Sequence, residues 1–166
     1  MQETADFTTL YFQSQTDTQA FAVRLAHAIL AHEKDIAQGG FNLRLEGGLG
    51  AGKTTLTRAL LRACGVTGRV RSPTFELVED YEIGNGLAFH HFDFYRFEAP
   101  EEFEDAGFRE LFGAGRVTAC EWSQKAGPYL PAADLTLSLT VDNLARKAEL
   151  KAFSPLGRAI FSEVTA

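Results

Sequence analysis

The sequence has few of the features that mark secreted, metal-binding or membrane proteins. Its two cysteines, Cys64 and Cys120, form neither a C-x-x-C pair nor a metal-spaced cluster, which favours reduced thiols in the cytoplasm. No apolar run approaches the length of a membrane span. The first residues, MQETADF, are polar and acidic, and we expect no secretory signal there. Together these absences predict a soluble cytoplasmic domain.

Basic residues are outnumbered and scattered. The chain has 16 Lys and Arg against 22 Asp and Glu, which gives a formal net charge of −6. Tight binding to nucleic acid usually requires a basic face that neutralises phosphates. We therefore expect no tight nucleic-acid binding by this chain alone, and action on RNA through a more basic partner stays open.

What the sequence does contain is an alternation of strand-like and helix-like segments. Its 166 residues predict one compact domain, residues 1–166. Strands are predicted at 7–14, 41–46, 74–83, 87–94, 116–122, 134–141 and 147–153. Helices are predicted after a cap at Thr16 or Asp17, and over 53–63, 99–112 and 156–164. The alternation predicts an α/β domain of three layers, a sheet flanked by helices, with a small antiparallel C-terminal part.

Glycines mark two boundaries in this pattern. Gly65 follows the helix at 53–63 and is expected to close it. The turn Gly-Asn-Gly at 84–86 separates two strand-like runs and predicts a hairpin.

The stretch LEGGLGAGKTT contains the spacing G-x-x-x-x-G-K-[ST], from Gly47 to Thr54, after a strand and before a helix. This is the context that a phosphate-binding loop requires. Glycines let backbone N–H groups approach phosphate oxygens, and the N-terminus of the next helix adds its dipole. Lys53 is expected to reach the β- and γ-phosphates, and Thr54 to offer a hydroxyl to Mg²⁺. The spacing does not fit the dinucleotide pattern G-x-G-x-x-G, so we predict a P-loop NTPase-like sheet that binds a nucleoside triphosphate.

Two acidic residues end apolar strands. Asp93 ends LAFHHFD and Glu121 ends VTACE. Ligands of open α/β sheets gather at the carboxyl ends of strands, and Mg²⁺ prefers oxygen ligands. Both residues are therefore candidate metal or catalytic groups, although a solvent-exposed strand end is the alternative for each. His90 and His91 stand side by side on one strand, and we expect one of them to face inward in a packing role.

Four blocks of the sequence together resemble the TsaE (YjeE) family. They are GGLGAGKTTLTR, SPTFELVEDY, HHFDFYRFEAPEEFEDAG and CEWSQKAGPYLP, which lie between about residues 41 and 131. The first block is general to P-loop proteins, and the other three make the resemblance specific. The sequence departs from the family pattern at HHFDFYRF, where phenylalanine stands in place of the usual leucine.

The resemblance implies an ATP site with Mg²⁺. It implies that Thr54 and Glu121 hold Mg²⁺, and that Asp93 and Lys53 are catalytic. It also implies that the segment from Ser72 to Thr74 is a switch near the γ-phosphate. The residues implied to bind ATP are Gln15, Gly48, Leu49, Gly50, Ala51, Gly52, Lys53, Thr54, Thr55 and Arg146.

The family resemblance also implies a function. Its members are bacterial P-loop ATPases required for threonylcarbamoyladenosine in tRNA, at position 37 of tRNAs that read codons starting with A. They act with TsaD and TsaB, and through these with tRNA. Two alternatives stay open from the residues: a P-loop kinase with Asp93 as base and Arg96 assisting, and a nucleotide-binding module without catalysis. No arginine is identified as a catalytic finger, with Arg69, Arg71 and Arg96 as candidates.

Overall fold

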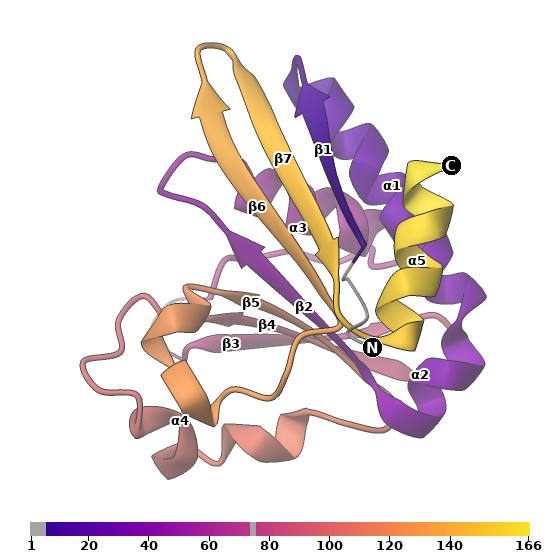
Figure 1. Cartoon of the computed structure of the whole chain (residues 1–166). Coiled ribbons are helices and arrows are strands. Elements are labelled where there is room, and N and C mark those ends of the chain that lie inside the picture. The colour runs from indigo at the N-terminus through magenta and orange to yellow at the C-terminus, as the bar shows by residue number, and fades with distance from the viewer. Residues whose placement is uncertain (1–5, 74–75) are drawn as a thin grey trace, which may run out of the picture.

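A seven-stranded mixed sheet forms the centre of the protein in the computed structural model, which describes residues 6–73 and 76–166 (Figure 1). The strands are β1 Phe7–Phe12, β2 Phe41–Glu46, β3 Val78–Ile83, β4 Leu87–Asp93, β5 Arg116–Glu121, β6 Leu135–Asp142 and β7 Ala145–Ala152. Their order in the sheet is β1-β7-β6-β2-β5-β4-β3. The four central strands β6, β2, β5 and β4 run parallel, and the outer strands pair antiparallel. The carboxyl ends of the parallel strands therefore meet at one edge of the sheet.

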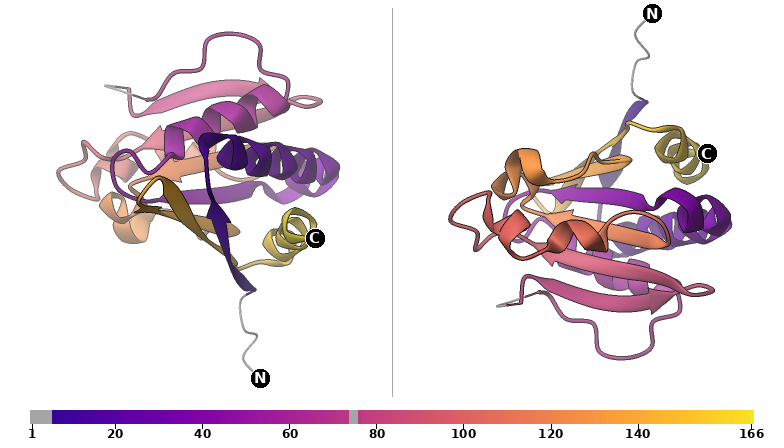
Figure 2. Two further views of the ribbon diagram at one scale, coloured as in Figure 1. Left: turned by 90° about the horizontal axis from the view of Figure 1, so that it is seen from above. Right: turned by 90° about the horizontal axis from the view of Figure 1, so that it is seen from below.

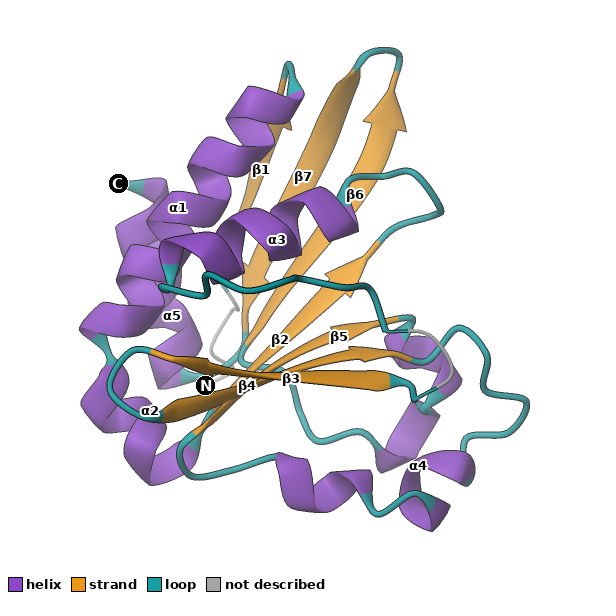
Figure 3. Ribbon diagram, turned by 180° about the vertical axis from the view of Figure 1, so that it is seen from behind, coloured by secondary structure: helices purple, strands orange, loops and turns teal. Residues whose placement is uncertain are grey.

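Helices cover the sheet. They are α1 Gln15–Ala31, α2 Glu33–Gly39, α3 Lys53–Ala63, α4 Glu102–Asp105 and α5 Pro155–Thr165, with short 3₁₀ helices η1 Phe108–Leu111, η2 Ser123–Lys125 and η3 Gly127–Tyr129. Helices α1 and α3 lie side by side in front of the strands when the molecule is seen from behind (Figure 3). The views from above and below show α4 and the 3₁₀ helices grouped away from α1 and α3 (Figure 2).

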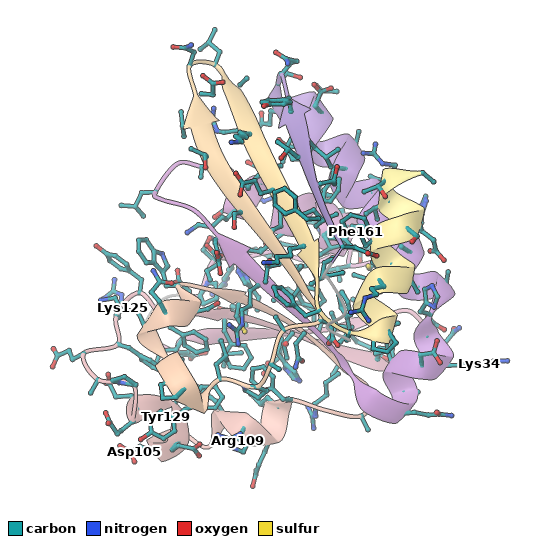
Figure 4. The ribbon with its side chains drawn as sticks, in the orientation of Figure 1. Lys34, Asp105, Arg109, Lys125, Tyr129 and Phe161 are labelled. Carbon is teal, nitrogen blue, oxygen red and sulfur yellow. The ribbon has the colours of Figure 1, made fainter. Side chains whose placement is uncertain are left out.

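The two faces of the sheet have separate apolar cores, which makes the predicted three layers. Val117 and Ala119 of β5 belong to the core that packs under α1, α3 and α5, and Phe161 of α5 borders it (Figure 4). Cys120 of the same strand belongs to the second core, which is rich in phenylalanine from β4, α4 and η1. Successive side chains of a strand point to opposite faces, so β5 supplies both cores.

Most predicted elements are confirmed, including the hairpin β3–β4 and the antiparallel β6–β7 pair. Gly65 follows α3 with a φ of 97°. Its N–H donates to the Arg62 carbonyl and that of Val66 to the Leu61 carbonyl, the pair of bonds that closes a helix with glycine. Among the described residues no helix is both long and apolar enough to cross a bilayer.

Several boundaries differ from the prediction. The cap of α1 is Ser14, whose hydroxyl accepts from the Asp17 amide at 3.4 Å, in place of Thr16 or Asp17. The short helix α2 was not predicted from the sequence. The strand predicted from residue 74 begins at Val78, after Leu77 with a φ of 67°, and residues 74–75 lie outside the described part.

The helix predicted over 99–112 is also wrong as a single element. It divides into α4 and η1 at Gly107, which has a φ of 72°. A left-handed residue ends the run of helical hydrogen bonds. The break lets Phe103 and Phe108 both enter the second core. Arg109 of η1 donates to the Tyr129 carbonyl of η3 at 2.9 Å, which joins the two parts of this layer (Figure 4).

Candidate functional site

The loop that connects β2 to α3 begins the site. Gly47 has a φ of 146° and Gly52 a φ of 108°. A Cβ atom on Gly47 would lie 2.6 Å from the Leu139 carbonyl oxygen of β6, closer than real Cβ atoms come. Glycine is therefore required at Gly47 by contact and by conformation, and the loop lies tight against the sheet edge.

Lys53, the first residue of α3, points into the site and is only 5% exposed. Its ammonium donates to the Gly47 carbonyl at 2.6 Å and lies 3.6 Å from Oε1 of Glu121. The ammonium also lies 4.7 Å from the centre of the Trp122 ring. The predicted phosphate-binding lysine thus faces the predicted metal-binding carboxylate.

Glu121 is the last residue of β5 and is 4% exposed. Its Oε2 lies 2.6 Å from Nε2 of His91, a buried residue of β4. A buried polar group needs such a partner, because leaving it unpaired costs free energy. Trp122 follows with a φ of 56°, so it is not part of the strand as predicted. This turn places its ring over Lys53.

Asp93 ends β4 directly beside Glu121 in the parallel β4–β5 pair. Burial raises the pKa of its carboxyl, and the nearby Glu121 carboxylate acts in the same direction. The Tyr95 amide, which donates to Oδ1 at 3.0 Å, opposes this rise. Carboxyl groups with a shifted pKa are common in catalytic sites, which makes Asp93 a candidate catalytic residue.

One cavity of about 260 Å³ brings most of the predicted site residues together. Its lining residues are Leu49, Gly50, Ala51, Gly52, Lys53, Thr54, Thr55, Asp93, Glu121 and Trp122. Thr54 Oγ1 lies 3.4 Å from the hydroxyl of Ser72, so the predicted switch segment reaches the cavity. Thr74 of that segment lies outside the described residues. Gly48 lines a different cavity, of about 500 Å³, which shares Trp122 with the first.

Another cavity, of about 310 Å³, adjoins the cavity of about 260 Å³ and shares Gly50, Gly52 and Thr55 with it. Gln15 lines it and donates to the Thr55 hydroxyl at 3.3 Å. Arg146 also lines it, and its guanidinium donates to the carbonyls of Gly50 and Ala51, both at 3.2 Å. In this structure Arg146 therefore braces the loop.

The donor set of the first cavity fits Mg²⁺ with a triphosphate. Thr54, Asp93 and Glu121 supply oxygens, the ligands that Mg²⁺ takes, and Lys53 supplies a cation for phosphate. In the described part of the chain no group of three or more His, Cys, Asp and Glu forms a metal site of side chains alone. Mg²⁺ itself keeps several waters and uses one or two carboxylates together with phosphates.

Sequence reasoning missed His91 as part of the site. His91 and Asp93 are two residues apart on β4, and such residues share a face of the strand. This spacing could have placed His91 beside the site.

Comparison with known proteins gives consistent relatives. The family model described as "Threonylcarbamoyl adenosine biosynthesis protein TsaE" matches residues 12–149. A Haemophilus influenzae protein named tRNA threonylcarbamoyladenosine biosynthesis protein TsaE is 46% identical over 118 residues, 71% of this chain and 74% of its own length. The Bacillus subtilis protein of the same name is 42% identical over 95 residues, 57% of this chain and 58% of its own.

The crystal structure of Bacillus subtilis YdiB has the same fold. It superposes with a TM-score of 0.71 at 24% identity and covers 99% of this chain and 97% of its own. The match of the family model over most of the chain and the identity to the Haemophilus protein agree with the four sequence blocks. The chain belongs to the TsaE family.

Proposed function

We propose that this chain is a Mg²⁺-dependent ATPase that acts in the biosynthesis of threonylcarbamoyladenosine in tRNA, the process for which its relatives are named. The observation that carries the proposal is the meeting of Lys53, Thr54, Asp93 and Glu121 around one cavity beneath the glycine loop. Phosphoryl transfer depends mainly on positioning and charge stabilisation, and these four groups supply both.

Each residue has a distinct role in the proposed reaction. Lys53 neutralises charge on the β- and γ-phosphates, and the loop amides and the start of α3 cradle them. Thr54 and Glu121 would hold Mg²⁺, which when bound offsets the charge that develops on the transferred group. Asp93 orients the attacking water. The adjoining cavity with Gln15 and Arg146 would take the nucleoside part of ATP.

The family match favours this function over a kinase for a small acceptor, which uses the same phosphate loop. We infer TsaD and TsaB as partners in the cytoplasm, with tRNA reached through the complex. The net charge of −6 supports an indirect relation to tRNA, because it gives this chain no general attraction to phosphates.

The test is an assay of purified protein with labelled ATP, alone and with TsaD, TsaB and tRNA. We expect slow release of phosphate by the protein alone and faster release with the partners, since a supplied arginine is worth roughly three to five decades in such reactions. A labelled acceptor in place of free phosphate would identify a kinase instead.

Two variants divide the roles of the carboxylates. Glu121→Ala should raise the Mg²⁺ concentration needed for ATP binding and suppress hydrolysis. Asp93→Ala should suppress hydrolysis more than binding. Binding that depends on Mg²⁺ equally in wild type and Glu121→Ala would contradict the metal assignment.

A further inference from the structure

We propose that His91 is a positioning residue for Glu121: it fixes one carboxylate oxygen so that the other is the oxygen offered to Mg²⁺. This inference rests on the proposed function, since it assumes that Glu121 is a metal ligand. It assigns a role in the site to one of the two adjacent histidines, for which the sequence predicted packing in place of catalysis.

The two oxygens of Glu121 have different partners. Oε2 lies 2.6 Å from Nε2 of His91, whereas Oε1 faces the Lys53 ammonium at 3.6 Å. The first contact is short and fully buried, and the second is longer than a hydrogen bond. Lys53 has its close contact elsewhere, with the Gly47 carbonyl at 2.6 Å. The Oε1 atom is thus held less closely than Oε2, and it is the oxygen that is available to another partner.

The surroundings of His91 show that its one bond is directed at Glu121. Its Nδ1 is buried and has no hydrogen-bond partner among the described residues. Because a carboxylate only accepts hydrogen bonds, His91 donates to Glu121 from Nε2. Among the described residues, the contact with Glu121 is therefore the hydrogen bond that orients the ring.

His90 is a built-in comparison. It is also buried, at 4% exposure, but it points to the other face of β4. Both of its ring nitrogens have partners, Nδ1 with Asp80 at 2.6 Å and Nε2 with Arg116 at 2.7 Å. Neither partner lines the cavity of the site. His90 thus links neighbouring strands of the sheet, whereas His91 contacts the carboxylate of Glu121.

Fixing Oε2 matters when Glu121 exchanges its other partner. Oε1 would be the oxygen that holds Mg²⁺, and Lys53 would then be available to the phosphates. A carboxylate without a second anchor would rotate about its terminal bond, which is a soft torsion. The bond from His91 removes that freedom. Partners that orient a metal ligand in this way are typically worth 10–100-fold in metal affinity.

The test measures how ATP binding depends on Mg²⁺. Trp122, the single tryptophan, has its ring next to Lys53, so its fluorescence can report ATP binding while MgCl₂ is titrated. His91→Leu removes the donor, and we expect it to raise the half-saturating Mg²⁺ by about 10-fold or more. Binding of ATP in the presence of EDTA should not change. His91→Gln places an amide N–H near the former Nε2 and should restore most of the wild-type requirement for Mg²⁺.

Controls separate positioning from packing. His90→Gln should leave the Mg²⁺ requirement unchanged. In a Glu121→Ala background, His91→Leu should add nothing, because its effect passes through Glu121. Thermal unfolding shows which variants fold, and His91→Met replaces the leucine variant if that one does not.

Three results would overturn the inference. If Glu121→Ala raises the Mg²⁺ requirement and folded His91→Leu does not, the role of His91 is wrong and the proposed function stands. If His91→Leu acts equally in wild-type and Glu121→Ala backgrounds, its effect is structural. If Glu121→Ala itself leaves the Mg²⁺ requirement unchanged, the metal assignment fails together with this inference.

Discussion

Three glycines of the phosphate loop should respond to alanine in a graded order. At Gly48 an added Cβ has nothing within 4 Å and φ is not positive. At Gly52 the Cβ would meet only the end of the Leu139 side chain at 3.9 Å, but φ is 108°. At Gly47 φ is 146° and the Cβ would lie 2.6 Å from a backbone carbonyl oxygen.

The magnitudes follow from these contacts. Gly48→Ala should change the free energy of unfolding by less than about 0.5 kcal/mol. Gly52→Ala carries a backbone strain of about 1–2 kcal/mol. Gly47→Ala adds to a similar strain the overlap with β6, which the loop relieves by moving, and we expect a loss of about 2–4 kcal/mol. For a domain of this size that loss lowers Tm by about 4–16 °C.

Gly47→Ala should also impair nucleotide binding, because the Gly47 carbonyl is the close contact of Lys53 at 2.6 Å. The assay is thermal unfolding of the three variants without nucleotide, followed by ATP titration with Mg²⁺. Gly48→Ala is the matched control, one residue away. Equal stability of the Gly47 and Gly48 variants would refute the close approach of the loop to β6.

Three further predictions address single groups. Lys53→Ala should abolish hydrolysis and weaken ATP binding while the fold survives, since Glu121 keeps its bond to His91; equal turnover would contradict the assignment. The raised pKa of Asp93 favours the folded state at low pH and disfavours it as pH rises through that pKa, because folded protein binds the proton more tightly. Asp93→Asn should therefore be more stable than wild type at pH 7 without metal, and urea titrations should show this gain shrinking toward pH 4. Burial raises the pKa of Cys64 to about 11 and of Cys120 to about 12, so a thiol reagent at pH 8 should react with neither in the folded protein and with both in urea; rapid reaction of the folded protein would show that one is accessible.

Sequence patterns predicted the phosphate loop and the two acidic residues of the site, because each depends on the structure of a short segment. The phosphate loop follows from spacing within one strand–loop–helix unit. Asp93 and Glu121 follow from their position at strand ends, because parallel strands bring those ends together. The link from His91 to Glu121 depends on register between β4 and β5, where Asp93 pairs with Glu121 and His91 with Ala119. A single sequence does not show that register.

The errors have physical causes. Residues 99–112 have the proline and acidic residues of a helix start, yet the chain turns at Gly107 to bury Phe103 and Phe108 in the second core. Tertiary burial of two aromatic rings outweighed a modest local preference. The cap of α1 is Ser14, earlier than predicted, for another reason. Strand β1 ends at Phe12 and α1 begins at Gln15, so only two residues form the turn between them.

The second core also explains how two acids are held at the sheet edge. Asp93 lies between Phe92 and Phe94, which are both fully buried and have ring centres 5.4 Å apart. The Phe94 amide donates to the Glu121 carbonyl at 3.2 Å, so the ends of β4 and β5 are joined beyond their last paired residues. Side chains anchored on one face of the sheet thus fix the backbone that presents carboxylates on the other. The aromatic layer, far from the phosphate loop in sequence, supplies the rigidity that an electrostatic site requires.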